Sequence, residues 1–293
     1  MGLITGYKAA IDGMTCLERF KIVTRGMDNA VACSSSNGAV VRSDTNRDWF
    51  GVAAGFGYLP PVLPGATFQF MGGAQNGQGW TSQGVGGAAN DTSTICDRVR
   101  IFCHPQESEL LYWHLYFSGN GSLTPGAESA EAVTSLATTP PCSIDLGITI
   151  GGTPVANIGY WDLEIKGNTT DPIWPSGRGG WPSRSRGNID AMITWRQFFD
   201  TVDELPDMLT PSDLFQTYQL FVQNSPQAKY WEIQCARLLD EPVDYVVRNK
   251  ENKPEYVVVE NRAGFSACDN SSPTPVMGHI ITPDGVTYWP SPS

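Results

Sequence analysis

The sequence has no long apolar segment and no apolar leader. Within its 293 residues, no stretch approaches the roughly 18 consecutive apolar residues that a membrane-spanning helix needs. The first residues, MGLITGYK, lack the apolar core and the cleavage site of a secretory signal peptide. We therefore expect a protein that does not enter a membrane and that is made and kept in the cytosol.

Residues that commonly carry catalysis are scarce. The chain has three histidines, and no serine or cysteine lies in the G-x-S-x-G pattern of a nucleophile elbow. Cys96, Cys103, His104 and His114 do not have the close spacing of zinc ligand pairs. No phosphate-binding loop is present, and the glycine run at 84–87 does not join a strand to a helix. The sequence predicts no enzyme activity, no metal site and no cofactor.

Basic residues are fewer than acidic residues. The chain has 19 basic and 30 acidic residues and a net charge of -11. Residues 1–145 hold 8 basic and 12 acidic residues (-4), and residues 146–293 hold 11 and 18 (-7). Neither half offers the basic surface that stable nucleic-acid binding requires. An acidic wall would nevertheless let nucleic acid pass without sticking, because like charges repel.

Glycine and proline are abundant, whereas helical patterns are rare. The 31 glycines and 21 prolines, without a charge-rich tract, are typical of a turn-rich β protein. The clearest strands are expected at 110–113, 190–195, 231–235 and 256–259. We expect 110–113 and 256–259 to be covered on both faces, because they are continuously apolar. Short helices are expected only within 200–213.

Cysteine usage indicates a reducing compartment. The seven cysteines are odd in number and scattered along the chain. This pattern suits buried reduced thiols better than a framework of disulfides.

The most informative feature is an internal repeat. The segment LPPVLP at 59–64, followed by Phe68, recurs as LPDMLTP at 205–211, followed by Phe215. Leu17–Ile22 aligns in the same way with Tyr160–Ile165, and Asn46–Asp48 aligns with Asn188–Asp190. Two hairpins correspond as well, one at 98–117 and one at 245–260. A chance alignment of apolar strands is the alternative to a duplication.

The repeat and the composition together predict the fold class. We expect a mainly β protein with two tandem related β-sandwich or barrel domains, each with at most one short helix. The first domain spans residues 1–124, a linker spans 125–142, and the second, diverged domain spans 143–293. Two further segments are expected to be functional loops: the glycine-rich stretch 72–94 and the arginine-containing stretch 174–186.

Three segments of the first repeat carry a resemblance to a known family. They are RDWFG at 47–51, PGATFQF at 64–70 and LYFSGNGSLT at 115–124. In this order they resemble the tail tube (major tail) proteins of long-tailed phages. The residues that carry the family motif are Asp48, Trp49, Gly51, Pro64, Gly65, Phe117, Gly119, Asn120, Gly121 and Leu123.

The resemblance covers residues 17–124, and the second repeat follows it only in outline. Asn188–Asp190 replaces the Asp-Trp strand start, and AGFS at 263–266 replaces Gly-Asn-Gly. Whether the second copy does the same job therefore stays open.

The resemblance implies a virion structural protein. Its subunits would form stacked rings around a channel through which DNA passes without specific binding, and they would contact other virion proteins. A duplicated subunit would build a pseudo-sixfold ring from three chains, and acidic residues that faced inward would suit the channel wall. We expect 72–94 to be an arm between rings. Candidate contacts between subunits are Gly77, Trp80, Gln83, Arg178, Trp181, Arg184 and Arg186.

Two other functions stay open at this point. The same fold could serve as a capsid decoration (cement) protein or as a tail adaptor, terminator or hub. Nine tryptophans and the matching positions of Asp48 and Asp190 could also indicate a carbohydrate-binding module or a glycosidase. Aromatic residues more often fill β cores, however, and an aspartate beside a turn is more often a local hydrogen-bond acceptor. A group of three arginines, at 178, 184 and 186, could pair with an acidic neighbour or a phosphate, or lie in a solvated loop.

Overall fold

The protein is all-β throughout the part of the chain that the structure describes. The computed structural model describes residues 7–11, 18–32, 40–74, 79–83, 93–103, 111–126, 146–175, 180–199, 215–223, 228–239, 257–265 and 278–289. These residues contain no α-helix. The helical turns that we expected within 200–213 lie outside the described residues.

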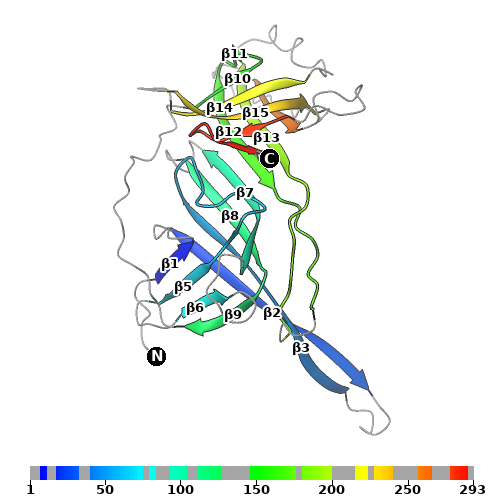
Figure 1. Ribbon diagram of the computed structural model, residues 1–293. Helices are drawn as coiled ribbons and strands as arrows, with labels where there is room; N and C mark the ends of the chain where they lie inside the picture. Colours follow the sequence, from blue (N-terminus) through cyan, green and yellow to red (C-terminus); the bar gives the residue numbers. More distant parts are fainter. Residues whose placement is uncertain are drawn as a thin grey trace, which may run out of the picture.

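The described residues form eighteen strands, and Figure 1 shows their arrangement. In the first half they are β1 (Tyr7–Ile11), β2 (Arg19–Ala32), β3 (Val40–Phe56), β4 (Thr67–Phe68), β5 (Phe70–Ala74), β6 (Gly79–Gln83), β7 (Thr94–Cys103), β8 (Tyr112–Gly119) and β9 (Ser122–Gly126). In the second half they are β10 (Gly147–Ile150), β11 (Thr153–Pro154), β12 (Ile158–Lys166), β13 (Asp190–Phe199), β14 (Gln216–Gln223), β15 (Lys229–Leu238), β16 (Val257–Phe265), β17 (Ile280–Ile281) and β18 (Thr287–Trp289).

One antiparallel sheet joins both halves of the chain. Its 14 strands include the path β11-β10-β14-β15-β16-β13-β12-β7-β8-β3-β2, and a separate 4-stranded sheet has the order β1-β5-β6-β9. Strand β7 of the first half pairs with β12 of the second half over six residue pairs. The prediction of a mainly β fold is confirmed, and this β7–β12 junction makes the halves share one sheet.

The strand pairings of the first half recur in the second half. The pairs β1–β5, β2–β3, β3–β8, β4–β7 and β7–β8 have counterparts in β10–β14, β12–β13, β13–β16, β14–β15 and β15–β16. The counterparts follow one another in the same order along the chain. The junction between β15 and β16 is short, with three residue pairs. The domain boundaries that we expect from the repeat stay a prediction.

The four clearest predicted strands are present, but one has a different environment from the one expected. They lie in β8, β13, β15 and β16. In β8, half-buried and buried side chains alternate along the strand, so that only one face is covered. The expectation that residues 110–113 are covered on both faces was wrong, because Tyr112 lies on the open side of the sheet. Because tyrosine is aromatic, the sequence here does not show the alternation of buried and open positions.

The glycine-rich stretch 72–94 is only partly a loop. Strands β5 and β6 lie in or overlap it, pair with each other and are flanked by β1 and β9. In this pair, Gly73 of β5 lies opposite Gly79 of β6, and Gly72 of β5 lies opposite Trp80 of β6. Glycine is disfavoured in strands, but it permits close approach of neighbouring chains. Residues 75–78 and 84–92 lie outside the described residues.

The core lies between the large sheet and the strands that fold over it. In the first half, Phe70 stacks on Phe117 of β8 with ring centroids 5.2 Å apart, and Phe68 packs edge-on against the same ring at 5.7 Å. In the second half, Tyr218 of β14 covers Trp195 of β13 at 5.8 Å. Apolar burial of this kind is the main stabilising term of each half.

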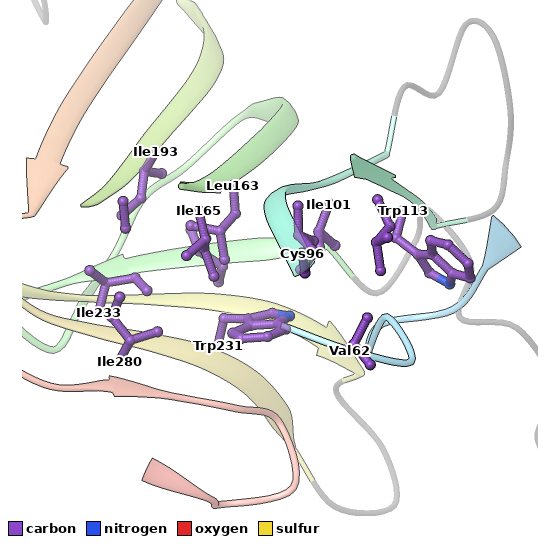
Figure 2. Packing of buried hydrophobic residues seen from close by; sticks show 14 of the residues in the cluster. Val62, Cys96, Ile101, Trp113, Leu163, Ile165, Ile193, Trp231, Ile233 and Ile280 are labelled. Atoms are coloured by element: carbon purple, nitrogen blue, oxygen red, sulfur yellow. The ribbon is translucent and has the colours of Figure 1, made fainter. Parts of the chain in front are cut away.

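The buried side chains of the two halves form a single cluster. Figure 2 shows Trp231 of β15 beside Val62, which belongs to the segment between β3 and β4. The Nε1 of Trp231 donates a hydrogen bond to the carbonyl of Tyr58 at 3.0 Å. The proline-rich segment at 59–64, which is part of the sequence repeat, therefore packs against the second half of the same chain.

The cysteines differ from the expectation of reduced thiols. Cys96 is a free, buried cysteine, and burial together with the charge of Asp97 raises the pKa of its thiol. Cys235, however, is disulfide-bonded. Its partner is not among the residues whose side chains the structure describes. The odd, scattered arrangement of cysteines concealed this bond, because sequence spacing does not reveal which cysteines meet in a fold.

Candidate assembly interface

The motif residues of the first half build the crossing between β3 and β8. Trp49 is fully buried, packs edge-on against Phe117 and donates a hydrogen bond from Nε1 to the carbonyl of Gly121 at 3.0 Å. Gly119 lies directly over the Trp49 ring, where a Cβ would come within 2.2 Å of Nε1. Gly51 faces Phe117 in the same way, at 2.4 Å. The motif thus describes tight packing in which two glycines leave room for two large rings.

Asp48 and Asn120 hold an arginine from the second half. One Nη of Arg184 contacts both carboxylate oxygens of Asp48, at 2.8 and 2.9 Å. Its other Nη donates to the carbonyl of Gly119 at 2.5 Å, and its backbone N–H donates to Oδ1 of Asn120 at 2.8 Å. Such an ion pair, with further hydrogen bonds to the same guanidinium, is among the strong polar contacts in proteins. We call these four residues the Arg184 clasp.

Arg184 is one of the predicted contacts between subunits. Its side chain is 7% exposed and binds partners in its own chain, and whether it also meets a neighbouring subunit stays a prediction. Asp48, at 14% exposure, also accepts a local bond from the backbone N–H of Trp49, although it lies within β3 and not beside a turn. Arg184 therefore fastens the second half to the first half within the chain.

Arg184 belongs to the long segment between β12 and β13, residues 167–189, which we call the strap. Its two arms are joined by the paired residues Ile173 and Ser183 and by a hydrogen bond from Gly187 to Gly167. The strap descends beside β3 toward the β2–β3 hairpin (Figure 1). There Arg47 donates its N–H to Gly180 and accepts a bond from the indole of Trp174. The strap thus holds the first half over most of the length of β3 that the motif occupies.

The remaining candidate contacts differ in what the structure describes. Trp181 is half-buried, and the guanidinium of Arg47 lies over its ring at 5.6 Å. Arg186 is exposed and lies against Gly65, whose φ of +83° favours glycine. Trp80 and Gln83 belong to β6, where their backbones pair with β9. Gly77 and Arg178 lie outside the described residues. Whether any of these residues meets a neighbouring subunit stays a prediction.

The P-G motif joins three elements. The N–H of Gly65 bonds to the carbonyl of Cys96 in β7, and the hydroxyl of Tyr288 in β18 donates to the carbonyl of Pro64. Burial raises the pKa of the Tyr288 phenol far above its ordinary value, so that it remains a donor. Leu123, the last motif residue, is buried in the core cluster.

A partly buried carboxyl group lies beside the clasp. Asp97 stands at a bulge near the start of β7 and accepts hydrogen bonds from the hydroxyls of Ser118 and Thr169. Its pKa is raised, mainly because burial disfavours the charged form and also because Asp48 is negative. The two hydroxyls and the positive charge of Arg184 act in the opposite direction. Sequence reasoning did not single out Asp97, because its partners are distant along the chain.

The raised pKa of Asp97 leads to a pH-dependent prediction. The folded protein holds this proton more tightly than the unfolded chain, so the stability that it contributes is present at low pH. That stability is lost as the pH rises from the usual value near 3.8 through the raised folded value. Replacing Asp97 with Asn should therefore help folding more at neutral than at acidic pH. Urea unfolding of both proteins at the two pH values measures this, and an equal difference at both would contradict it.

The open side of the large sheet forms a polar face. It runs across β2, β3, β8, β7, β12, β13 and β16, opposite the buried side chains. By register its basic residues are Arg19, Lys21, Arg25, Arg98, Arg100, Lys166, Arg196 and Arg262, and its acidic residues are Asp48, Asp162, Glu164, Asp190 and Glu260. The difference, 8 - 5 = +3, is opposite in sign to the charge of the chain.

The titration of a histidine reflects this positive field. Burial lowers the pKa of His114 on β8, and the nearby charges of Arg100, Arg19 and Arg98 lower it further. Aromatic rings accompany the arginines: Arg98 lies over Tyr116 at 3.9 Å and Arg100 lies over Phe102 at 4.7 Å. This face therefore does not share the net negative charge of the whole chain.

The large sheet ends in a long edge strand. Strand β2 has 14 residues and pairs with β3 on one side, and in the described part of the chain no strand pairs with its other side. An exposed edge of this length is a template for pairing with another chain. On the same sheet, β16 pairs with β13 over 257–264 but with β15 only over 263–265. Within the described residues, β2 and residues 257–261 of β16 therefore offer backbone groups for pairing.

Two kinds of feature are absent from the described residues. No group of three or more His, Cys, Asp or Glu side chains in them is placed to hold a metal ion. Nor does that part of the chain include a helix long and apolar enough to span a membrane. No protein-family model matches the sequence, and no curated protein matches it. Function must therefore be argued from the edges, the polar face and the clasp.

Proposed function

We propose that the protein is a virion structural protein, a tail tube subunit that assembles into stacked rings around a channel for DNA. Each ring contains three chains and has pseudo-sixfold symmetry. The observation that carries the proposal is the β7–β12 junction, in which one half of the chain joins the other edge to edge. The proposal also draws on the resemblance of the motif residues to tail tube proteins.

The junction supports ring formation because it is heterologous. The last strand of the first four-stranded row, β7, meets the first strand of the next row, β12. The rows β2-β3-β8-β7 and β12-β13-β16-β15 have the same pairing order. Repeating this contact between chains joins the far end of the second row to β2 of a neighbour. Heterologous contacts close into a ring when the rotation at each contact permits.

The dimensions of such a ring are compatible with a DNA channel. Three chains with eight strands each give 24 strands. At a strand spacing of about 4.8 Å and a tilt of about 40°, a closed barrel of this size measures roughly 45–50 Å across at the backbone. Side chains narrow that width, and the remainder accommodates a duplex. The polar face then lines the channel, and the covering strands lie outside.

The motif residues contribute to this assembly indirectly. Trp49, Gly51, Phe117 and Gly119 fix how β3 crosses β8, and the Arg184 clasp fixes the strap on the polar-face side of that crossing. Rigid rows of strands have well-defined edges, and pairing between chains needs such edges. The motif therefore preserves the shape of the building block, while the edges make the contacts.

Electron microscopy of the purified protein over a concentration series, with its mass in solution measured in parallel, tests the proposal. We expect rings of three chains that stack into tubes as concentration rises. Particles that remain monomeric at all concentrations would contradict it. Discrete trimers that bind capsid shells and never stack would instead favour a decoration or adaptor protein.

A further inference from the structure

The β7–β12 junction combines backbone pairing with two ion pairs. On the polar face, Nε of Arg100 donates to Oδ2 of Asp162 at 2.6 Å, and Nη1 of Arg98 contacts Oε1 of Glu164 at 2.9 Å. The arginines lie on β7 and the carboxylates on β12, at alternate positions of each strand. The sequence R-x-R on one edge is thus matched by D-x-E on the other.

Strand β2 occupies the position in the first half that β12 occupies in the second. Each is the first strand of its row, and the apolar side chains of both face the core. In the sequence alignment of the repeat, Arg19 takes the position of Asp162 and Lys21 takes that of Glu164. On the polar face β2 carries Arg19, Lys21 and Arg25, and no carboxylate occurs between residues 19 and 25. The charge of this edge is therefore reversed.

The reversal restricts which strand can pair with β2. A strand with the sequence of β7 would bring Arg98 and Arg100 against Arg19 and Lys21. Two β2 edges related by a twofold axis would likewise place cations opposite cations. Like charges across an interface cost several kcal/mol, so both arrangements are disfavoured.

We infer that Arg19 and Lys21 select an acidic strand edge, namely the second half of another copy of this chain. This inference rests on the proposed ring. The second half carries a charge of -7 and the first half -4, by the residue counts given above. Glu260 on the polar face of β16 is 39% exposed, and in the described residues β15 pairs with β16 only at 263–265. Arg19 and Lys21 thus determine the order of halves around the ring, first to second and never first to first.

Charge reversal in the full-length protein tests the inference in the assembled state. The variant R19E/K21E should need about tenfold or more higher concentration for half-maximal assembly than the wild type, since 1.4 kcal/mol corresponds to a factor of ten. The charge-conserving variant R19K/K21R should assemble as the wild type does. Analytical ultracentrifugation at low and high salt measures this, and high salt should reduce the difference. Equal assembly of R19E/K21E and wild type would overturn the inference and leave the ring intact.

A peptide-binding experiment tests the charge selectivity of the β2 edge even if the protein forms no ring. The probes are a peptide of residues 94–103 and the same peptide with Arg98→Glu and Arg100→Glu. We expect the glutamate peptide to bind the full-length protein at least about tenfold more tightly, and to lose that advantage on R19E/K21E. Binding of this kind to a protein that stays monomeric would refute the proposed ring but support the selectivity of the edge. Equal binding of the two peptides, or no binding of either, would overturn the selectivity itself.

Discussion

The variant Arg184→Met is expected to lose about 3 kcal/mol of unfolding free energy, the lower end of the range for a broken buried ion pair, because it leaves the partly buried Asp48 carboxylate without the Arg184 guanidinium. The guanidinium also satisfies the carbonyl of Gly119, which would lose its donor. Methionine keeps the length and the apolar stem of the side chain, so lost packing is a minor part of the effect. Urea unfolding followed by tryptophan fluorescence measures the change.

Two further variants separate the ion pair from general damage to the strap. Arg186→Met changes an exposed arginine two residues away and should cost less than about 1 kcal/mol. The double variant Asp48→Asn with Arg184→Met removes both charges and should be more stable than Arg184→Met alone. If Arg186→Met destabilised the protein as much as Arg184→Met, the clasp would not be the cause.

Gly119→Ala should destabilise the protein by about 3 kcal/mol, at the upper end of the range for overpacked cores. The new methyl group would lie 2.2 Å from Nε1 of Trp49, whose ring is fully buried and hydrogen-bonded to Gly121. Neither the strand nor the ring can move without breaking other contacts. The melting temperature and the unfolding free energy should both fall.

Two controls separate the clash with Trp49 from the effect of alanine itself. One is the same substitution at another glycine, and the other is Gly119→Ala in a second background. At Gly147 in β10 the nearest side-chain atom to a new Cβ is 3.8 Å away, so Gly147→Ala should be close to neutral. In a Trp49→Phe background, which removes Nε1, Gly119→Ala should cost less than in the wild type. An equal cost in both backgrounds would show that contact with the indole is not responsible.

Local patterns in the sequence predicted individual strands well. In β13 and β15 apolar and polar residues alternate, because one face of each strand is buried and the other is open. The pattern was less clear in β8, where Tyr112 and Tyr116 are aromatic but belong to the polar face. Strands β5 and β6 were missed, because glycines replaced the apolar residues that mark a strand.

Contacts between distant parts of the chain were not predicted. Asp48 and Arg184 are 136 residues apart, and neither lies in a pattern that points to the other. For the β7–β12 junction a usable signal existed: arginines at alternate positions of β7, and carboxylates at alternate positions of β12. The repeat predicts two separate domains, and the edges of separate domains are not expected to pair with each other.

The strap has a consequence for how the protein is made on the ribosome. A chain is synthesised from its N-terminus, and domains generally fold as they emerge. The first half, however, lacks the arginine that neutralises Asp48 and the strand that covers the edge of β7 until residues as far as 189 have been added. During that interval the nascent first half exposes two unsatisfied edges, β2 and β7, instead of one. The order of synthesis thus makes the first half dependent on the second for completion of its own fold.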